Sequence, residues 1–292
     1  MRTSSPLRYP GGKSCMFELT SAIMRRNGLE RGHYAEPFAG GCGLALSLLY
    51  SGSVAEIHIN DLDPAIWAFW HSVLNETEAF ISKLNKTRAT LEEWQRQREV
   101  LRNQDNQDSL TLGFSAFFLN RTNRSGIIKG GGVIGGLDQR GNYKIDCRYN
   151  VDDLSKRIRR IAKYRDRIHL TNLDAIDFLA DCKNLPRNSL TFIDPPYFKK
   201  GPGLYTSFYK PEDHAVLSKQ VLKLTSPWVV TYDDVPQIRD LYRSRRQFCF
   251  DINYSLQEKR IGTELLIASK GLKMPEETRD RQVNVPQHQV AA

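Results

Sequence analysis

Asp194-Pro195-Pro196-Tyr197 is the stretch whose residue types suit chemistry most directly. It follows Leu190 to Ile193, four apolar or β-branched residues that predict a buried parallel strand. Because each proline restricts its own backbone and that of the residue before it, the chain should leave the strand stiffly. The Asp194 carboxylate and the Pro195 carbonyl can accept both N–H bonds of an exocyclic amine, and Tyr197 can stack on a planar base. A proline-rich turn that merely ends a strand is the alternative interpretation.

A second candidate site lies where Glu36 precedes a glycine-rich turn and an apolar helix. Glycines at 40, 41 and 43, beside Phe38, let a small ligand press against the backbone. The turn lacks the third glycine of a dinucleotide-binding fingerprint, because position 46 is Leu, and it lacks the G-K-[ST] ending of a phosphate-binding loop. The turn therefore favours a ligand without a pyrophosphate.

Asp61 follows the next predicted strand, Val54 to Ile59, where a carboxylate can bind a ribose diol. An amino group bound by Glu36, a ribose bound by Asp61 and no pyrophosphate together indicate S-adenosylmethionine. Asp63 and Pro64 are typical of a helix start. Each acid alone is more often a helix cap or a solvated charge.

Two further stretches contribute candidates to the same site. Gly11 and Gly12 precede Lys13 and a predicted amphipathic helix, so their N–H groups can face an anion beside the lysine charge. Asp174 follows the predicted strand at Ile168 to Leu170. It can bond an adenine amino group or cap the next helix, and the cap is the favoured role for a single residue.

The composition is that of a soluble globular protein. The 292 residues are 40% hydrophobic and 26% charged, and they allow one large domain or two modest ones. No stretch approaches 18 consecutive apolar residues and the start has no apolar signal region, so we expect a cytoplasmic protein that has no membrane span. Five cysteines without CxxC spacing predict a reduced chain with no metal site.

The net charge of +9 is concentrated in the middle of the chain. Residues 79–172 hold 19 Lys or Arg against 10 Asp or Glu, and the remainder holds equal numbers of both signs. Surplus charge confined to one segment is typical of contact with a polyanion, and nucleic acid is the partner it favours.

This middle segment also has a distinct pattern. Residues 65–104 read as helices with apolar stripes, and Leu110 to Asn120 reads as another apolar helix. A basic stretch from Arg121 to Lys129 then meets a glycine run, residues 130–136, which predicts a hairpin or arm that adapts to a partner, although a flexible loop is the alternative. A basic helix follows over Asp152 to Tyr164.

Taken in order, these motifs resemble the D12 class, or Dam group, of DNA adenine N6-methyltransferases. The resemblance covers residues 7 to 270 and rests on Tyr9-Pro10-Gly11-Gly12-Lys13, Glu36-Pro37-Phe38-Ala39-Gly40-Gly41-Cys42-Gly43, Asn60-Asp61, Phe118-Leu119-Asn120-Arg121 and Asp194-Pro195-Pro196-Tyr197.

The resemblance implies an α/β fold of the Rossmann-like methyltransferase type, with seven mostly parallel strands and a small, mainly helical target-recognition domain that carries a hairpin or loop arm. The catalytic domain would comprise residues 1–65 and 165–272 and the recognition domain residues 66–164. The polar residues 273–292 are expected to be disordered.

The resemblance and the patterns together assign roles to residues. Catalysis is expected of Asp194, Pro195, Pro196 and Tyr197. Binding of S-adenosylmethionine is expected of Tyr9, Gly11, Gly12, Lys13, Glu36, Phe38, Gly40, Gly41, Gly43, Asp61, Asp174 and Asp194. Contact with double-stranded DNA is expected of Asn120, Arg121, Arg124, Lys129, Arg148, Arg157 and Arg160. No metal is expected.

Several alternatives stay open on the sequence alone. Family members that read GATC carry an arginine where this chain has Lys129, and lysine cannot make the forked contact of arginine to guanine, so that target is not implied. An RNA or protein N-methyltransferase would keep the same cofactor site, and a catalytically silent DNA-binding regulator would keep the basic insert. The sequence fits both a monomer and a subunit of a restriction system.

Overall fold

The computed structural model describes residues 4–8, 12–199, 209–255 and 259–283. Among the predicted site residues, Tyr9 and Gly11 lie outside these ranges.

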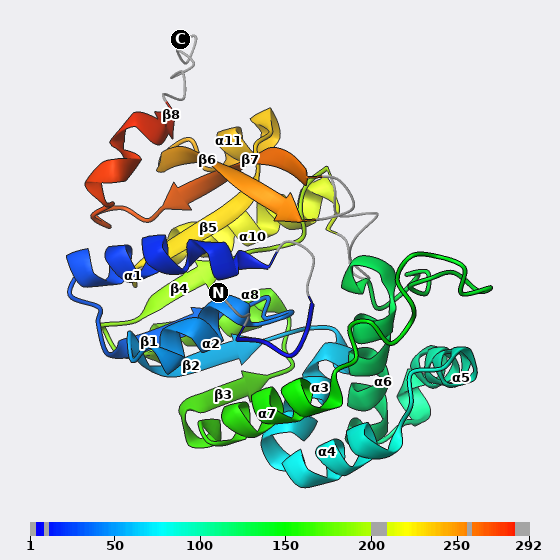
Figure 1. The fold of residues 1–292 in the computed structure, drawn as a ribbon. Coiled ribbons are helices and arrows are strands. Elements are labelled where there is room, and N and C mark those ends of the chain that lie inside the picture. The colour runs from blue at the N-terminus through cyan, green and yellow to red at the C-terminus, as the bar shows by residue number, and fades with distance from the viewer. Residues whose placement is uncertain (1–3, 9–11, 200–208, 256–258, 284–292) are drawn as a thin grey trace.

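A mixed sheet of eight described strands, in the order β3-β2-β1-β4-β5-β7-β6-β8, forms the centre of the molecule (Figure 1). The parallel part comprises β1 (Gly32–Glu36), β2 (Val54–Asn60), β3 (Ile168–Thr171), β4 (Leu190–Ile193) and β5 (Trp228–Asp233). The antiparallel part comprises β6 (Arg246–Ser255), β7 (Lys259–Ala268) and β8 (Gln282–Val283). The predicted α/β class with a mostly parallel sheet is confirmed.

The sheet has one more described strand than the seven predicted, and the additional strand is the short β8. Its two residues pair with Gln247 and Phe248 of the edge strand β6. A 3-10 helix, η6 (Glu276–Arg281), leads into β8, and its Thr278 is buried. Residues 276–283 thus form regular elements in the structure, because backbone pairing with a sheet edge does not require a repeating apolar pattern, and the expected disorder of residues 273–292 stays a prediction.

Helices cover both faces of the sheet, as expected for parallel strands buried on both sides. On one face lie α1 (Phe17–Arg26) and α2 (Gly43–Tyr50), and on the other lie α8 (Ala175–Asp181), α10 (Pro211–Lys223) and α11 (Pro236–Leu241). Apolar residues of these helices pack against strand residues such as Phe192, Val229 and Ile193.

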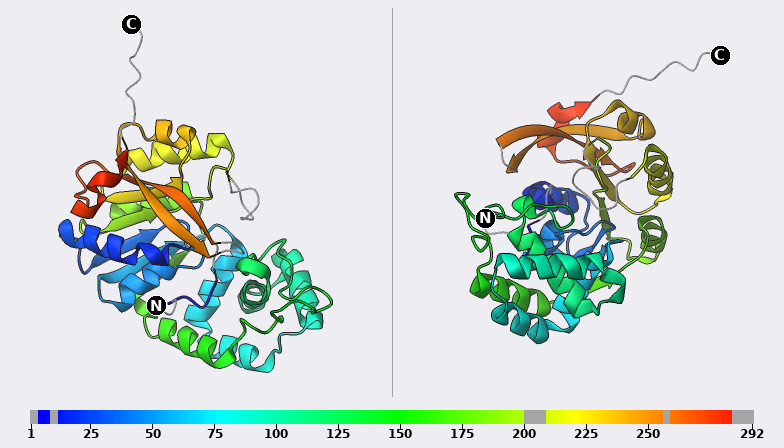
Figure 2. Two further views of the ribbon diagram at one scale, coloured as in Figure 1. Left: turned by 45° about the horizontal axis from the view of Figure 1, so that its top comes forward. Right: turned by 90° about the vertical axis from the view of Figure 1, so that its right-hand side faces the viewer.

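A group of helices stands beside the sheet in Figure 1 and in the left view of Figure 2. It comprises α3 (Pro64–Asn75), α4 (Thr77–Lys86), α5 (Leu91–Arg102), α6 (Ser109–Thr122) and α7 (Val151–Ala162). Helix α6 crosses α3 closely because Gly113 has no side chain, and an added Cβ there would lie 2.5 Å from the Ala68 carbonyl oxygen. The helical character predicted for residues 66–164 is seen, and the domain boundaries stay a prediction.

The glycine-rich arm between α6 and α7 is built from turns, with one isolated bridge between Asn123 and Val133 in place of a hairpin ladder. The buried side chain of Asn123 closes its base by donating to the carbonyls of Ile127 and Ile128 and accepting from the Trp94 indole N–H. None of the described helices is both long and apolar enough to cross a membrane.

Candidate active site

The strand order places the predicted site at a change of direction in the sheet. From β1 the chain proceeds to β2 and β3 on one side, and it returns to β4 and β5 on the other. In open α/β sheets, ligands bind at the carboxyl ends of the strands that flank such a switch point. Here Glu36 ends β1, Asp61 follows β2 and Asp194 follows β4.

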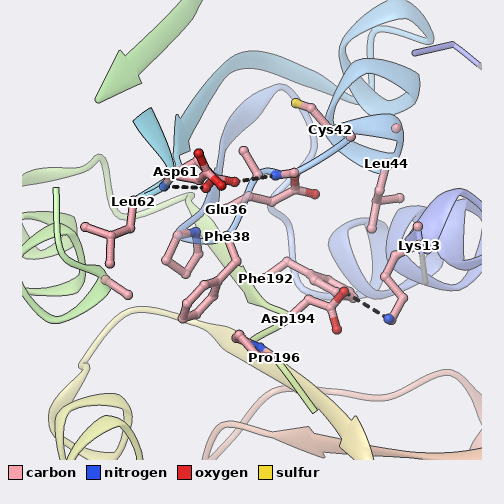
Figure 3. Close-up of a pocket in the computed structure, with 18 of the residues that line it drawn as sticks. Lys13, Glu36, Phe38, Cys42, Leu44, Asp61, Leu62, Phe192, Asp194 and Pro196 are labelled. Atoms are coloured by element: carbon pink, nitrogen blue, oxygen red, sulfur yellow. Dashed lines mark hydrogen bonds and ion pairs between the residues drawn. The ribbon is translucent and has the colours of Figure 1, made fainter. Parts of the chain in front are cut away.

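These three acids line one pocket (Figure 3). Part of its wall is apolar, formed by Phe38, Leu44, Leu62, Phe192 and Pro196. The pocket also includes the glycine turn and residues on both sides of it: Gly12, Lys13, Pro37, Ala39, Gly40, Gly41, Cys42, Gly43, Asp63, Ala175 and Tyr209. A pocket with an apolar wall and a few converging polar groups suits an organic ligand of cofactor size.

The glycine turn is held in place from two sides. Gly40 has a φ of +44°, its N–H donates to Asp61 Oδ2 over 2.8 Å, and its carbonyl accepts from the Trp70 indole N–H over 3.0 Å. At Gly43 an added Cβ would lie 2.4 Å from Ser14 Oγ. The turn therefore keeps its backbone close to the pocket because neighbouring elements fix it.

Asn60 aligns the loops that surround the pocket. Its buried side-chain amide donates to the carbonyls of Pro37 and Leu173, and its side-chain oxygen accepts from the Thr171 hydroxyl and the Leu173 N–H. One asparagine thus joins the loops after β1, β2 and β3, which carry Glu36, Asp61 and Asp174.

Burial changes the acidity of two pocket carboxyls. It raises the pKa of Asp61 to about 7, although the Gly40 and Asp63 N–H groups favour the charged form. Burial also raises the pKa of Glu36 to about 8, opposed by the hydrogen bond that its carboxylate accepts from the Tyr34 hydroxyl. Perturbed carboxyls gathered in one pocket are typical of functional sites.

Asp194 is fixed by two donors from distant parts of the chain. Lys13 Nζ donates to its Oδ2 over 2.9 Å, and the Thr231 hydroxyl donates to its Oδ1 over 2.7 Å. Burial raises the pKa of Asp194, and the Lys13 ammonium opposes this rise. Each carboxylate oxygen of Asp194 thus accepts one hydrogen bond from the protein. These two bonds fix the orientation of the carboxylate and of its remaining lone pairs.

Lys13 and Tyr197 belong to one buried network with Glu264. Lys13 is 6% exposed, and its Nζ also donates to the Tyr197 hydroxyl over 2.9 Å and lies 3.6 Å from Glu264 Oε2. The Tyr197 hydroxyl in turn donates to Glu264 Oε1. Burial lowers the pKa of Lys13, but the Asp194 and Glu264 carboxylates outweigh it, so the net shift is upward.

This network changes the picture of Tyr197 drawn from the sequence. The residue is 3% exposed and does not line the pocket. A base that stacks on its ring has to displace protein atoms that now cover it, so the predicted stacking stays a prediction. Lys13 faces two carboxylates of the protein, and its role beside an anion of the cofactor stays a prediction.

The segment after Tyr197 is anchored by the carboxylate of Asp233 at the end of β5. It accepts from the backbone N–H groups of Phe198 and Lys199 over 2.8 and 2.9 Å. The direction in which the chain leaves the Asp194 motif is therefore fixed by β5 as well as by the prolines.

Most predicted cofactor residues meet at the pocket, with clear exceptions. Gly12, Lys13, Glu36, Phe38, Gly40, Gly41, Gly43, Asp61 and Asp194 line it. Pro196, predicted to be catalytic, lines it as well. Asp174 caps α8 by accepting from the Ile176 N–H and does not line the pocket, so the cap is its observed role. Pro195 is buried and is not among the residues that line the pocket.

The predicted DNA-contacting residues divide into two groups. Asn120 is fully buried, with its side chain bonded to both backbone groups of Arg8 and to the Gly126 carbonyl, and its contact with DNA stays a prediction. Arg121 donates to the carbonyls of Pro6 and Arg148, and Arg157 donates to the Ser5 carbonyl. These side chains tie the N-terminal segment to the helical insert.

The other group is available at the surface. Arg124, Arg148 and Arg160 are exposed, and the Arg160 guanidinium lies 3.9 Å from the centre of the Tyr50 ring. Lys129 is partly exposed and pairs with Asp63 over 3.0 Å, which links the arm to the rim of the pocket.

Several contributing residues were not foreseen from the sequence. Glu264 directly precedes the apolar strand segment Leu265 to Ala268. A lone acid beside such a segment was the sequence signal that could have identified it. Thr231 and Trp70 carried no signal, because a threonine in a strand and a tryptophan on an apolar helix face are ordinary core residues.

Comparison with known families agrees with this geometry. The family model described as D12 class N6 adenine-specific DNA methyltransferase matches residues 9–259, which is most of the chain. No curated protein matches the chain.

Proposed function

The chain belongs to the D12 class of N6 adenine-specific DNA methyltransferases, and from this premise we propose that it methylates N6 of an adenine flipped out of double-stranded DNA. Methylation of adenine in DNA with S-adenosylmethionine is the activity of this family. The observation that carries the finer proposal is the joint placement of Glu36, Asp61 and Asp194 around one pocket, with Asp194 held by Lys13 and Thr231.

The residues present fit S-adenosylmethionine. Asp61 can accept ribose hydroxyls, Glu36 can accept from an amino group, and the apolar wall with Phe38 and Phe192 can cover a purine ring. The open backbone of the glycine turn admits close approach of the ligand. When bound, the cofactor supplies an electrophilic methyl group on a positively charged sulfur.

The protein's part in the reaction is mainly to orient the amino group. The lone pair of adenine N6 is conjugated with the ring and is a weak nucleophile. Hydrogen bonds from both amino protons to Asp194 and the Pro195 carbonyl would turn the lone pair out of the ring plane, toward the methyl carbon. The negative charge of Asp194 also favours the positive charge that develops on N6. The proton can leave after transfer, so no strong general base is needed.

DNA is proposed to bind along the helical insert and its arm. The surplus positive charge lies in this part of the chain, and Arg124, Arg148 and Arg160 are exposed there. Phosphate contacts from such residues give affinity without sequence preference, whereas residues of the arm that enter a groove would read bases.

The test begins with mapping modified adenines in DNA of cells that express the protein. Purified protein is then assayed on a duplex and on a single strand of the mapped sequence, with mass spectrometry of the product. The proposal expects N6-methyladenine, faster on the duplex, and fluorescence enhancement of 2-aminopurine placed at the target. A methylated cytosine, or 2-aminopurine that stays quenched, would contradict it.

Asp194→Ala is the decisive variant, with Asp181→Ala as the control. Asp181 is an exposed acid at the end of α8 that does not line the pocket. We expect Asp194→Ala to lose methyl transfer while it still binds S-adenosylmethionine, and Asp181→Ala to keep both. Near wild-type turnover by Asp194→Ala would remove Asp194 from the mechanism. Methylation of an RNA of the same sequence at the same rate would favour the RNA alternative.

A further inference from the structure

A cluster of histidines lies on the sheet away from the candidate active site. His33 on β1, His58 on β2 and His169 on β3 are three of the chain's six histidines, and the strand pairing sets them side by side with Glu56 of β2. The rings of His33 and His58 stack with their centres 5.2 Å apart, and those of His58 and His169 stack with their centres 4.4 Å apart. They share the α8 face of the sheet with Ala35, because His58 pairs with Ala35 and His169.

The ring nitrogens and the carboxylate converge on a small volume. His33 Nδ1 lies 2.9 Å from His58 Nε2 and 3.9 Å from Glu56 Oε2, and the ligand atoms of these three residues all lie within 4.8 Å of one another. Tetrahedral zinc with bonds of about 2.0–2.1 Å separates its ligand atoms by about 3.3 Å. Small side-chain rotations therefore suffice to bring the three atoms into a first coordination sphere.

The chemistry of the set matches a borderline divalent metal. Two imidazoles and one carboxylate are a zinc ligand set that leaves a fourth position for water.

The fourth residue supports the ligand carboxylate. His169 Nε2 lies 2.6 Å from Glu56 Oε2, the same oxygen that faces His33. An outer hydrogen bond of this kind orients a ligating carboxylate and strengthens its binding. The side chains of His33, Glu56 and His169 are 19%, 35% and 46% exposed, so an ion has a path from solvent.

We propose that His33, His58 and Glu56 bind a divalent transition metal ion, with Zn²⁺ as the favoured ion, and that His169 is a positioning residue for Glu56. The ion would tie β1 to β2 on the sheet face, set back from the carboxyl edge that carries the pocket. Its role is structural, since none of these residues lines that pocket. The sequence prediction of no metal rested on the cysteines, whereas the proposed ligands come from separate strands.

The test is calorimetric titration of Zn²⁺ into the untagged full chain. We expect one equivalent to bind with micromolar or tighter affinity, and the Tm to rise by roughly 5 °C at a hundredfold excess over Kd. Substituting Co²⁺ should give the visible absorption of a nitrogen- and oxygen-bound ion. Failure to bind one equivalent would overturn the proposal.

Variants separate this cluster from the free cysteines, which also bind zinc. His58→Gln should abolish the binding of the one Zn²⁺ equivalent, and His169→Gln should weaken its affinity about tenfold. His71→Gln should leave zinc binding unchanged, because His71 lies on α3 beside Trp67 and Glu76. Circular dichroism checks each fold, and Glu56→Gln replaces His58→Gln if the latter fails to fold. Unchanged binding in both ligand variants would assign the zinc to cysteine and refute the proposal.

Discussion

The buried Asp61 carboxyl has a pKa close to physiological pH, so we expect cofactor binding to depend on pH. Burial raises its pKa to about 7, so the carboxylate dominates above pH 7 and the neutral acid below it. Because ribose hydroxyls donate best to the carboxylate, we expect the affinity for S-adenosylmethionine to fall about tenfold from pH 8 to pH 6. Calorimetry at pH 6, 7 and 8 measures this.

Asp61→Asn separates this effect from the titration of Glu36. An amide can still accept the Gly40 N–H but cannot ionise, so the variant should lose about 1–3 kcal/mol of binding free energy at pH 8. It should also lose most of the change between pH 6 and 7. Undiminished affinity at pH 8 would remove Asp61 from the cofactor site.

Tyr197→Phe should be more harmful than its small change suggests. Phenylalanine keeps the aromatic ring for stacking, but the lost hydroxyl is buried and bonds to both Lys13 and Glu264. Without the hydroxyl, the buried charged groups of Lys13 and Glu264 each lose a hydrogen bond. We therefore expect the free energy of unfolding to fall by about 1–3 kcal/mol. Urea denaturation measures it, and Tyr143→Phe, at an exposed tyrosine of the arm, is the control. Equal stability of the two variants would mean that the network contributes little.

The residues that the sequence identified and those that it missed differ in a physical way. Glu36, Asp61 and Asp194 could be predicted because each follows its own strand, and parallel strands bring their carboxyl ends to one edge. Glu264 and Thr231 could not, because their contact with Lys13 and Asp194 depends on which strands become neighbours. Local sequence patterns do not contain that information.

Helix α7 and the arm form the surface expected to hold phosphates. Arg148→Ala and Arg160→Ala should each lower the salt slope of DNA binding by about one, for all sequences alike, since both side chains are exposed. Arg124→Ala should instead change discrimination between target and non-target DNA. Duplex binding across a salt titration distinguishes these outcomes, and Arg243→Ala, exposed after α11, is the control.

Asn120 illustrates a different use of the same region. Its side chain joins α6 to the N-terminal segment and to Gly126, where an added Cβ would lie 2.0 Å from the Arg8 carbonyl oxygen. We expect Asn120→Ala to lower the free energy of unfolding by about 1–3 kcal/mol and to leave the salt slope unchanged. If Asn120→Ala changed the salt slope of DNA binding and kept wild-type stability, the result would support the predicted DNA contact.

The helices of the insert could be predicted from apolar periodicity, whereas the conformation of the arm could not. Its turns depend on the Asn123 side chain and on glycines with positive φ, such as Gly135 and Gly136. Several loop conformations are compatible with such a glycine run, and long-range contacts such as Lys129 to Asp63 select among them.

At the scale of the whole molecule, the last described residues complete the sheet. Strand β8 pairs with β6, and Arg26 of α1 pairs with Glu276 over 3.2 Å. A chain that ends at residue 275 should therefore unfold at a lower temperature than a chain that ends at residue 283. Scanning calorimetry of the two proteins decides this, and equal unfolding temperatures would show that η6 and β8 contribute nothing to stability.

The pairing of Lys13 with Asp194, 181 residues away, also has a consequence for synthesis. While the ribosome is still making the central helices, the ammonium of Lys13 has neither Asp194 nor Glu264 to neutralise it, and it must stay hydrated. The pocket can close only after β4 and β7 have emerged and joined the sheet. Chains terminated before β7 consequently lack Glu264 of this network, and chains terminated before the end of β4 lack Asp194 as well.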